Sequence, residues 1–343
     1  MAKANVTETK AKDNNMNEPG TKNLITDVDG IKIGNAEDER AMTGVTALIP
    51  DASAVTGVDV RGGGPGTRET EVLNPDCLVE RVEGIVLSGG SVYGLEAAAG
   101  AVMALAKQER GFDVRGIRVP IVPSAILFDL ANAGSKDWGD MPPYRRLGIE
   151  AVENATDDFP LGNIGAGYGA AAGKMKGGLG SASLIGEDGV QVGAVFAVNP
   201  VGSVVIPGTR SFWAWPFEQN AEFGGFEPPE LATDMSLDIP VESRLAENTT
   251  IGVVATNIAL TKSEAKRIAI MAHDGLARAI RPVHTPFDGD SIFAMSTERE
   301  ELSGPRPFGV ARIGAMAADC VARSIARAVY NAKSLGGLPG YMS

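Results

Sequence analysis

The sequence predicts one α/β (α+β) domain, in which β-sheets are covered by long alanine-rich helices. Three observations favour this class. Of the 343 residues, 44% are hydrophobic and 22% are charged, so the chain can bury a large core. Short apolar segments bounded by turn residues recur along the chain, which is typical of strands. Segments rich in alanine and aliphatic residues lie between and after them, and their apolar residues repeat with helical spacing.

The expected elements follow in order along the chain. Residues 1–23 are polar and have no apolar period, so we expect a disordered tail, followed by a single domain over residues 24–343. Strands are predicted at 44–49, 54–60, 84–87, 190–198, 203–206, 251–256 and 291–296, and helices at 93–107, 261–280 and 310–332. Thr261 and Glu264 have the spacing of a capping box at the start of the second helix. The polar stretch 213–248 is predicted to be a long surface connection.

Composition excludes several classes of function. The net charge of −12 disfavours nucleic acid as a partner, because phosphate binding relies on clustered Lys and Arg. The sequence contains no run of about 18 apolar residues, so no membrane span is predicted. The N-terminal segment lacks the apolar core of a secretion signal, and we therefore expect a cytoplasmic protein. The two cysteines and two histidines form no cluster with metal-site spacing. We therefore expect no metal, no cofactor and no disulfide framework.

The junction Asn248-Thr249 stands directly before a β-branched apolar strand. If the chain breaks before Thr249, this residue supplies both a hydroxyl nucleophile and a free amine. An α-amine has a pKa near ~8, so it can take the hydroxyl proton near neutral pH. Without such a break, the same residues are the ordinary start of a strand. The residue types alone leave both interpretations open.

Two acids follow in the segment Asp288-Gly289-Asp290. In an extended segment both carboxylates point to one side, where they could hold a protonated amine. A surface Asp-Gly turn is the alternative. His284, four residues earlier, could join a site that transfers protons, whereas His273 lies in an apolar helical pattern and is expected to be structural.

Two glycine-rich segments are further candidates for a binding or catalytic site. The turn from Gly89 to Gly94 leads from a strand into a helix and could present N–H groups to an anion, although a tight connection explains it equally. Lys174 follows a second glycine-rich stretch, but the surrounding sequence does not match a phosphate-binding loop. Lys174 is either a charged site residue or a solvated lysine.

Taken together, four segments resemble the P1 family of self-processing N-terminal-nucleophile hydrolases. The segments are 87–97, 198–202, 248–251 and 284–290, and the resemblance runs from about residue 24 to the C-terminal helix. That family includes DmpA-type D-/L-aminopeptidases, β-peptidyl aminopeptidases and nylon-oligomer endohydrolases. The resemblance implies a four-layer αββα sandwich, commonly assembled into tetramers.

The resemblance also implies a set of roles. The chain would be cleaved between Asn248 and Thr249 into a large subunit (1–248) and a small subunit (249–343), with Thr249 as nucleophile. Asn199 matches a donor to the oxyanion, Asp288 and Asp290 match acids that orient the nucleophile and its ammonium, and Lys174 matches a site lysine of the nylon-hydrolase branch. Phe128 and Tyr93 are candidates for the substrate pocket. Phe128 stands where the nylon hydrolase carries a tyrosine, so that hydroxyl is missing.

The expected activity is hydrolysis of linear amides through an acyl-enzyme on Thr249. A threonine nucleophile and the Asp-Gly-Asp segment are similar to the nylon-hydrolase branch, because the aminopeptidases use serine and a Ser-x-Glu segment. The substrate would then be a 6-aminohexanoate oligomer or a short peptide. Aminopeptidase activity, an acyltransferase similar to ornithine acetyltransferase, and a non-catalytic small-molecule binder are the alternatives.

Overall fold

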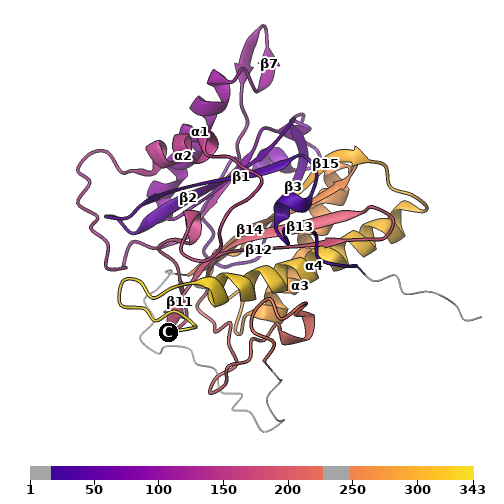
Figure 1. The fold of residues 1–343 in the computed structure, drawn as a ribbon. Helices are drawn as coiled ribbons and strands as arrows, with labels where there is room; N and C mark the ends of the chain where they lie inside the picture. The colour runs from indigo at the N-terminus through magenta and orange to yellow at the C-terminus, as the bar shows by residue number, and fades with distance from the viewer. Residues whose placement is uncertain (1–16, 227–247) are drawn as a thin grey trace, which may run out of the picture.

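The computed structural model describes residues 17–226 and 248–343, and these residues form two main β-sheets with four long helices (Figure 1). The helices are α1 (Glu96–Lys107), α2 (Tyr144–Glu153), α3 (Lys262–Ala279) and α4 (Arg306–Asn331). Within the described residues, no helix combines the length and the apolar character that crossing a bilayer requires.

The first main sheet has five strands in the order β1-β2-β6-β9-β4. Their bounds are β1 (Ile31–Asp38), β2 (Thr43–Pro50), β6 (Ile85–Ser88), β9 (Ser124–Ile126) and β4 (Thr67–Arg68). Helices α1 and α2 pack against this sheet, through a core that includes Val45, Ala47, Ala101 and Leu147. The two helices approach closely because glycines lie at their contact: a Cβ at Gly148 would come within 2.0 Å of the Ala97 carbonyl oxygen.

The second main sheet has six strands in the order β12-β13-β14-β15-β3-β5. Their bounds are β12 (Gly178–Ile185), β13 (Gln191–Asn199), β14 (Thr249–Ile258), β15 (Ser291–Glu300), β3 (Ala54–Val60) and β5 (Arg81–Val82). Helices α3 and α4 pack against this sheet through the largest apolar cluster. Another buried cluster joins side chains of both sheets, among them Ile33, Leu87, Val195 and Phe293.

Two short hairpins complete the strands. They are β7 (Phe112–Val114) with β8 (Ile117–Val119), which projects beyond α1 in Figure 1, and β10 (Ala171–Ala172) with β11 (Met175–Lys176). Short 3-10 turns lie at Ile25–Asp27, Glu71–Leu73, Ser91–Leu95, Gly165–Gly167 and Trp215–Phe217.

Most of the predicted strands and all three predicted helices are confirmed, with small shifts at their ends. The expected capping box is present at α3: the Thr261 hydroxyl accepts from the Glu264 N–H, and the Glu264 carboxylate accepts from the Thr261 N–H. The first helix begins later than predicted, at Glu96, because residues 91–95 form a 3-10 turn.

The predicted strand at 203–206 is wrong. Only isolated bridges occur there, because the Ser203 hydroxyl accepts from the Val205 N–H and donates to the Val205 carbonyl, which curls the backbone. The sequence patterns did not predict the long strands β1 and β12, the short strands β4, β5 and β7 to β11, or helix α2. β12 begins Gly-Leu-Gly-Ser-Ala-Ser and has a β-branched residue only at its last position, Ile185, yet it lies buried beneath α4.

Order at the N-terminus begins before residue 24. Glu18 and Ile185 exchange two backbone hydrogen bonds, and Lys22 forms an ion pair with Asp157 at 2.7 Å, so residues 17–23 are not part of a disordered tail. Residues 1–16, the rest of the predicted tail, lie outside the described residues.

The expected surface connection at 213–248 is also corrected in part. Glu222 is buried against α4, where it forms an ion pair with the fully buried Arg323 at 2.5 Å, and Phe223 joins the α3/α4 core. Residues 227–247 lie outside the described residues.

Candidate active site

The topology of the six-stranded sheet brings the candidate site residues to one edge. β14 begins at Thr249 and lies between β13, which is antiparallel to it, and β15, which is parallel. The C-terminal end of β13 and the N-terminal end of β15 therefore both lie beside Thr249. Asn199 is the last residue of β13 and pairs directly with Thr249, while Asp288 and Asp290 immediately precede β15.

The Thr249 hydroxyl contacts the carbonyl group at the expected cleavage point. Its Oγ1 donates a hydrogen bond to the Asn248 carbonyl oxygen at 2.5 Å. The Gly289 N–H donates both to that carbonyl oxygen (3.2 Å) and to Thr249 Oγ1 (3.1 Å). A hydroxyl, a peptide carbonyl and a backbone N–H donor thus meet at one point. Thr249 itself is only 4% exposed.

Asp288 and Asp290 are both buried, which argues against the surface-turn interpretation. One oxygen of Asp290 accepts from the Thr250 N–H at 2.8 Å, and one oxygen of Asp288 accepts from the Val201 N–H at 3.3 Å. Burial, and the negative charge of Asp290 close by, raise the pKa of Asp288. The two carboxylates therefore flank the start of β14 in a water-poor environment.

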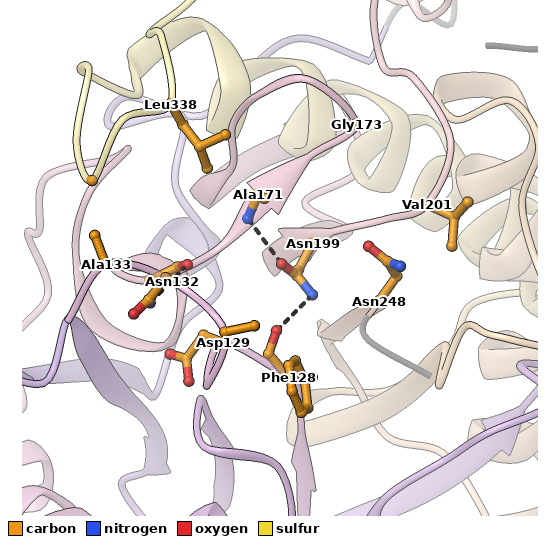
Figure 2. Close-up of a pocket in the computed structure, with 13 residues that line it drawn as sticks. Phe128, Asp129, Asn132, Ala133, Ala171, Gly173, Asn199, Val201, Asn248 and Leu338 are labelled. Atoms are coloured by element: carbon orange, nitrogen blue, oxygen red, sulfur yellow. Dashed lines mark hydrogen bonds between the residues drawn. The ribbon is translucent and has the colours of Figure 1, made fainter. Parts of the chain in front are cut away.

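The side-chain amide of Asn199 lies in the wall of a cavity and connects β10 with the segment that follows β9 (Figure 2). Its Oδ1 accepts from the Ala171 N–H at 2.8 Å, and its Nδ2 donates to the Phe128 carbonyl at 3.2 Å. These bonds fix the side chain beside Asn248, which also faces the cavity.

The cavity has a volume of about 340 Å³. It is lined by Phe128, Asp129, Ala131, Asn132, Ala133, Gly169, Ala171, Gly173, Asn199, Val201, Asn248, Gly336 and Leu338. Phe128 is one of these lining residues. Tyr93 is not among the lining residues; it is exposed and packs edge-on against Trp138, with ring centroids 5.8 Å apart.

Two lysines of the glycine-rich segment have different environments. Lys174 is exposed on the turn between β10 and β11, next to Gly173 of the cavity wall. Lys176 is buried, and its ammonium donates to the carbonyls of Gly167, Ala170 and Gly177. Burial lowers the pKa of Lys176 to about 7. Lys176 therefore holds together the loop that presents the Ala171 N–H to Asn199.

The turn after β6 is a tight connection that binds a carboxylate of the protein itself. A Cβ at Gly90 would come within 2.0 Å of the Tyr144 ring, so only glycine fits. The Gly90 N–H donates to Asp129, which also accepts from the Thr43 hydroxyl at 2.6 Å. Burial raises the pKa of Asp129 to about 6. The sequence pattern did not mark Asp129, although an acid within the apolar run 126–130 was a usable signal.

His284 lies against Asp290, with Nδ1 2.8 Å from a carboxylate oxygen. His273 packs edge-on against His284, with ring centroids 4.9 Å apart. In the part of the chain that the structure describes, no group of three or more His, Cys, Asp or Glu side chains is placed to hold a metal ion.

Comparison with known proteins decides the family. Residues 23–342 match the sequence model of Peptidase family S58. The chain belongs to that family. An uncharacterized aminopeptidase of Mycobacterium tuberculosis is 41% identical over 93% of this chain and 97% of its own length. A 6-aminohexanoate-oligomer endohydrolase of a Kocuria species is 31% identical over 82% of this chain and 77% of its own. Both names support a hydrolase.

Solved structures support the fold of this S58 chain. It is similar to a Burkholderia β-aminopeptidase, with a TM-score of 0.67, 20% identity and coverage of 96% and 93% of the two chains. It is also similar to the L-aminopeptidase D-Ala-esterase/amidase of Ochrobactrum anthropi, with a TM-score of 0.66, 21% identity and coverage of 94% and 90%. The latter is described as a variant of the Ntn hydrolase fold, so the mixed α/β architecture is of that type.

The expected resemblance to self-processing hydrolases and their nylon-oligomer branch is therefore consistent with the S58 family. The mycobacterial relative is more similar to this chain than the Kocuria endohydrolase is, at 41% against 31% identity. The chain is thus similar both to a relative named as an aminopeptidase and to one named as an oligomer endohydrolase.

Proposed function

We propose that this chain is a self-processing amide hydrolase that cleaves its own backbone between Asn248 and Thr249 and then uses Thr249 as an N-terminal nucleophile. One observation carries the proposal: the Thr249 hydroxyl, the Asn248 carbonyl and the Gly289 N–H lie within hydrogen-bond distance of one another. A nucleophile in contact with a carbonyl whose oxygen already has an N–H donor has the arrangement that acyl transfer requires.

Self-cleavage would proceed in two steps. Thr249 Oγ1 attacks the Asn248 carbonyl carbon, and the Gly289 N–H stabilises the negative charge that develops on the carbonyl oxygen. The C–N bond to Thr249 then breaks, and the hydroxyl proton ends on the nitrogen, which becomes the new α-amine. Water next attacks the ester carbon; its hydroxyl stays on the Asn248 carboxyl group, and a proton returns to Oγ1.

Hydrolysis of a substrate would reuse the same atoms. The free amine of Thr249 takes the proton of its own hydroxyl as Oγ1 attacks the substrate amide, and it later returns a proton to the leaving amine. Asp288 and Asp290 would orient the Thr249 backbone and its ammonium form. Asn199 pairs with Thr249 in the β13–β14 ladder, and we propose that its side-chain amide contacts the substrate oxyanion.

The cavity of about 340 Å³ favours a small linear amide, either a short peptide or a 6-aminohexanoate oligomer. The higher identity to a relative named as an aminopeptidase favours removal of an N-terminal residue. The threonine nucleophile and the Asp-Gly-Asp segment favour the oligomer. Lys174, on the turn next to the cavity wall, is proposed as a site lysine, and assembly into a tetramer of processed pairs is part of the same proposal.

Self-cleavage of the purified chain tests the proposal. We expect purified protein to give two bands on a denaturing gel, with the smaller fragment beginning at Thr249 by mass spectrometry. Thr249→Ala should remain one band and be inactive, and Thr249→Ser should still cleave. Thr250→Val is the matched control, because the Thr250 hydroxyl is buried with no hydrogen-bond partner among the described residues. Cleavage of Thr249→Ala would refute the proposal.

A panel of substrates then separates the two activities. Amino-acid amides, β-peptides and linear 6-aminohexanoate oligomers should be compared by kcat/KM with the cleaved protein. An aminopeptidase requires a free amine next to the scissile bond, so blocking that amine by acetylation should abolish its activity. An endohydrolase should still cut the interior of a blocked oligomer.

A further inference from the structure

His284 contacts Asp290, the carboxylate that accepts from the Thr250 N–H, through two of its nitrogens. Both the backbone N–H of His284 (3.1 Å) and its ring Nδ1 (2.8 Å) contact the same oxygen, Asp290 Oδ2. The other oxygen, Oδ1, contacts the Thr250 N–H. Asp290 therefore links His284 directly to the backbone at the start of β14.

The backbone of His284 is shaped for this contact. Its φ is +54°, in the left-handed region that non-glycine residues rarely occupy, and this conformation accompanies the contact of both nitrogens with one oxygen. Because an ionised carboxylate only accepts hydrogen bonds, Nδ1 of His284 must be the donor.

His273 packs against the His284 ring from helix α3 and stays neutral. Its Nε2 lies 3.1 Å from the Asp59 carbonyl oxygen, so it is the donor, and its Nδ1 has no hydrogen-bond partner among the described residues. Burial lowers the pKa of His273 to about 4. His273 therefore contributes no positive charge beside His284.

The charged groups around the pair come from three elements. Asp290 and Asp288 precede β15, His273 belongs to α3, and Asp59 is on β3 with its carboxylate 3.5 Å from His273 Nε2. Asp59 is also paired with Arg61, so its charge is already balanced. His284 is the ring that contacts the Asp290 carboxylate, with Nδ1 2.8 Å from Oδ2.

We propose that His284 is a positioning residue for Thr249: it holds Asp290 in the orientation that fixes the Thr249-Thr250 backbone, and its proton offsets the charge of Asp290 opposite the new amine. The inference deepens the proposed function and rests on it. An unbalanced carboxylate near an ammonium favours the protonated amine, which cannot act as a base. A protonated His284 opposes this effect, so the amine becomes available at lower pH.

His284→Asn and His284→Ala separate the two parts of this role. Asparagine tolerates positive φ, and its Nδ2 can replace Nδ1 as donor, but it does not titrate. We expect His284→Asn to cleave itself within about threefold of the wild-type rate, and His284→Ala to cleave at least about tenfold more slowly. Cleavage should be followed on gels after a pulse of cell-free synthesis.

The pH dependence of kcat/KM tests whether His284 offsets the charge of Asp290. In cleaved His284→Asn, we expect the acid limb of kcat/KM to move to higher pH by about 0.5 to 1 unit, because Asp290 is no longer offset. His273→Gln is the matched control: glutamine can keep the bond to the Asp59 carbonyl, and the neutral ring it replaces carries no charge. We expect its profile to match the wild type.

Three results would overturn the inference. They are a His284→Ala chain that cleaves at the wild-type rate, a His284→Asn profile that superimposes on the wild-type profile, and a shift seen with His273→Gln instead. If Thr249→Ala also cleaves, the proposed function itself fails. If Thr249→Ala stays intact while the histidine variants behave as the wild type, only this inference is lost.

Discussion

Gly289 shows how one residue without a side chain can control the site. It stands between two buried carboxylates, and its N–H reaches both the Thr249 hydroxyl and the Asn248 carbonyl. A Cβ at this position would lie 2.7 Å from Thr249 Oγ1 and 2.9 Å from the Gly64 carbonyl oxygen. Neither neighbour can withdraw easily, because the second is backbone and the first is the proposed nucleophile.

We therefore expect Gly289→Ala to slow self-cleavage at least about 100-fold, since displacing the hydroxyl or the N–H donor costs transition-state stabilisation. Gly64→Ala is the matched control from the facing segment, where a Cβ would meet only ordinary contacts of 3.7 Å or more. Both variants should be compared by gel after equal times of synthesis, with circular dichroism to confirm folding. Equal cleavage of the two would contradict the role of Gly289.

Asp129 leads to a prediction about stability. Because burial raises its pKa to about 6, the folded protein retains a proton that the unfolded chain has already lost above about pH 4. Stability is therefore lost as the pH rises from about 4 to 6. An asparagine in place of Asp129 would keep both hydrogen-bond partners without this penalty.

We expect the stability of Asp129→Asn relative to the wild type to increase as the pH rises from 4 to about 6 and to stay constant above that, with a final gain on the order of 1–3 kcal/mol. Denaturant unfolding of both proteins at several pH values measures this difference. Asp113→Asn, on the exposed β7–β8 hairpin, is the control for removal of a surface carboxylate. Parallel stability curves for Asp129→Asn and the wild type would contradict the prediction.

The sequence named residues whose chemistry is visible in their type and spacing. Thr249 before a strand and the pair Asp288 and Asp290 were identified in this way, whereas Asn199 was identified only through the family resemblance. The structure brings all four residues to one sheet edge. Gly289 and Asp129 were not identified as functional, because their importance lies in contacts with residues 40 and 86 positions away. The local sequence pattern does not indicate contacts between residues so far apart in the chain.

At the scale of elements, periodicity predicted the regular parts well. The helix pattern of α3 is buried where expected, and β3 has the predicted bounds. The missed strand β12 is rich in glycine for a reason of packing: a Cβ at Gly180 would lie 1.9 Å from the Ser324 carbonyl of α4. Because α4 approaches this strand so closely, large side chains do not fit there, and the β-branched residues by which a strand is recognised are largely absent.

The α3–α4 contact gives a prediction at this scale. A Cβ at Gly275 would lie 2.3 Å from the Ala318 carbonyl oxygen, so the two helices would have to separate. We expect Gly275→Ala to destabilise the fold by about 1–3 kcal/mol, despite the better helix propensity of alanine. Thermal unfolding measures the effect.

Gly314→Ala is the matched control on the same pair of helices. Its Cβ would meet the far end of the flexible Met271 side chain, which can move aside. We expect this variant to be as stable as the wild type or slightly more stable. If Gly275→Ala were as stable as Gly314→Ala, close helix contact would not limit this interface.

At the scale of the whole molecule, the proposed break divides the six-stranded sheet in an unusual way. β14 and β15 would belong to the small subunit, whereas β13 and β3, which flank them on either side, would belong to the large one. Helices α3 and α4 of the small subunit also cover strands of the large one.

Cleavage should therefore leave one particle. Separating the fragments would break two strand ladders at once and expose the α3/α4 core, whose members come from both sides of the junction. We expect the fragments to co-elute on size exclusion even at nanomolar concentration, and to separate only in denaturant. Residues 249–343 expressed alone should not fold, because β14 and β15 would lack both flanking strands. Elution of a free small fragment under native conditions would show that the interface between the two subunits is weaker than this sheet implies.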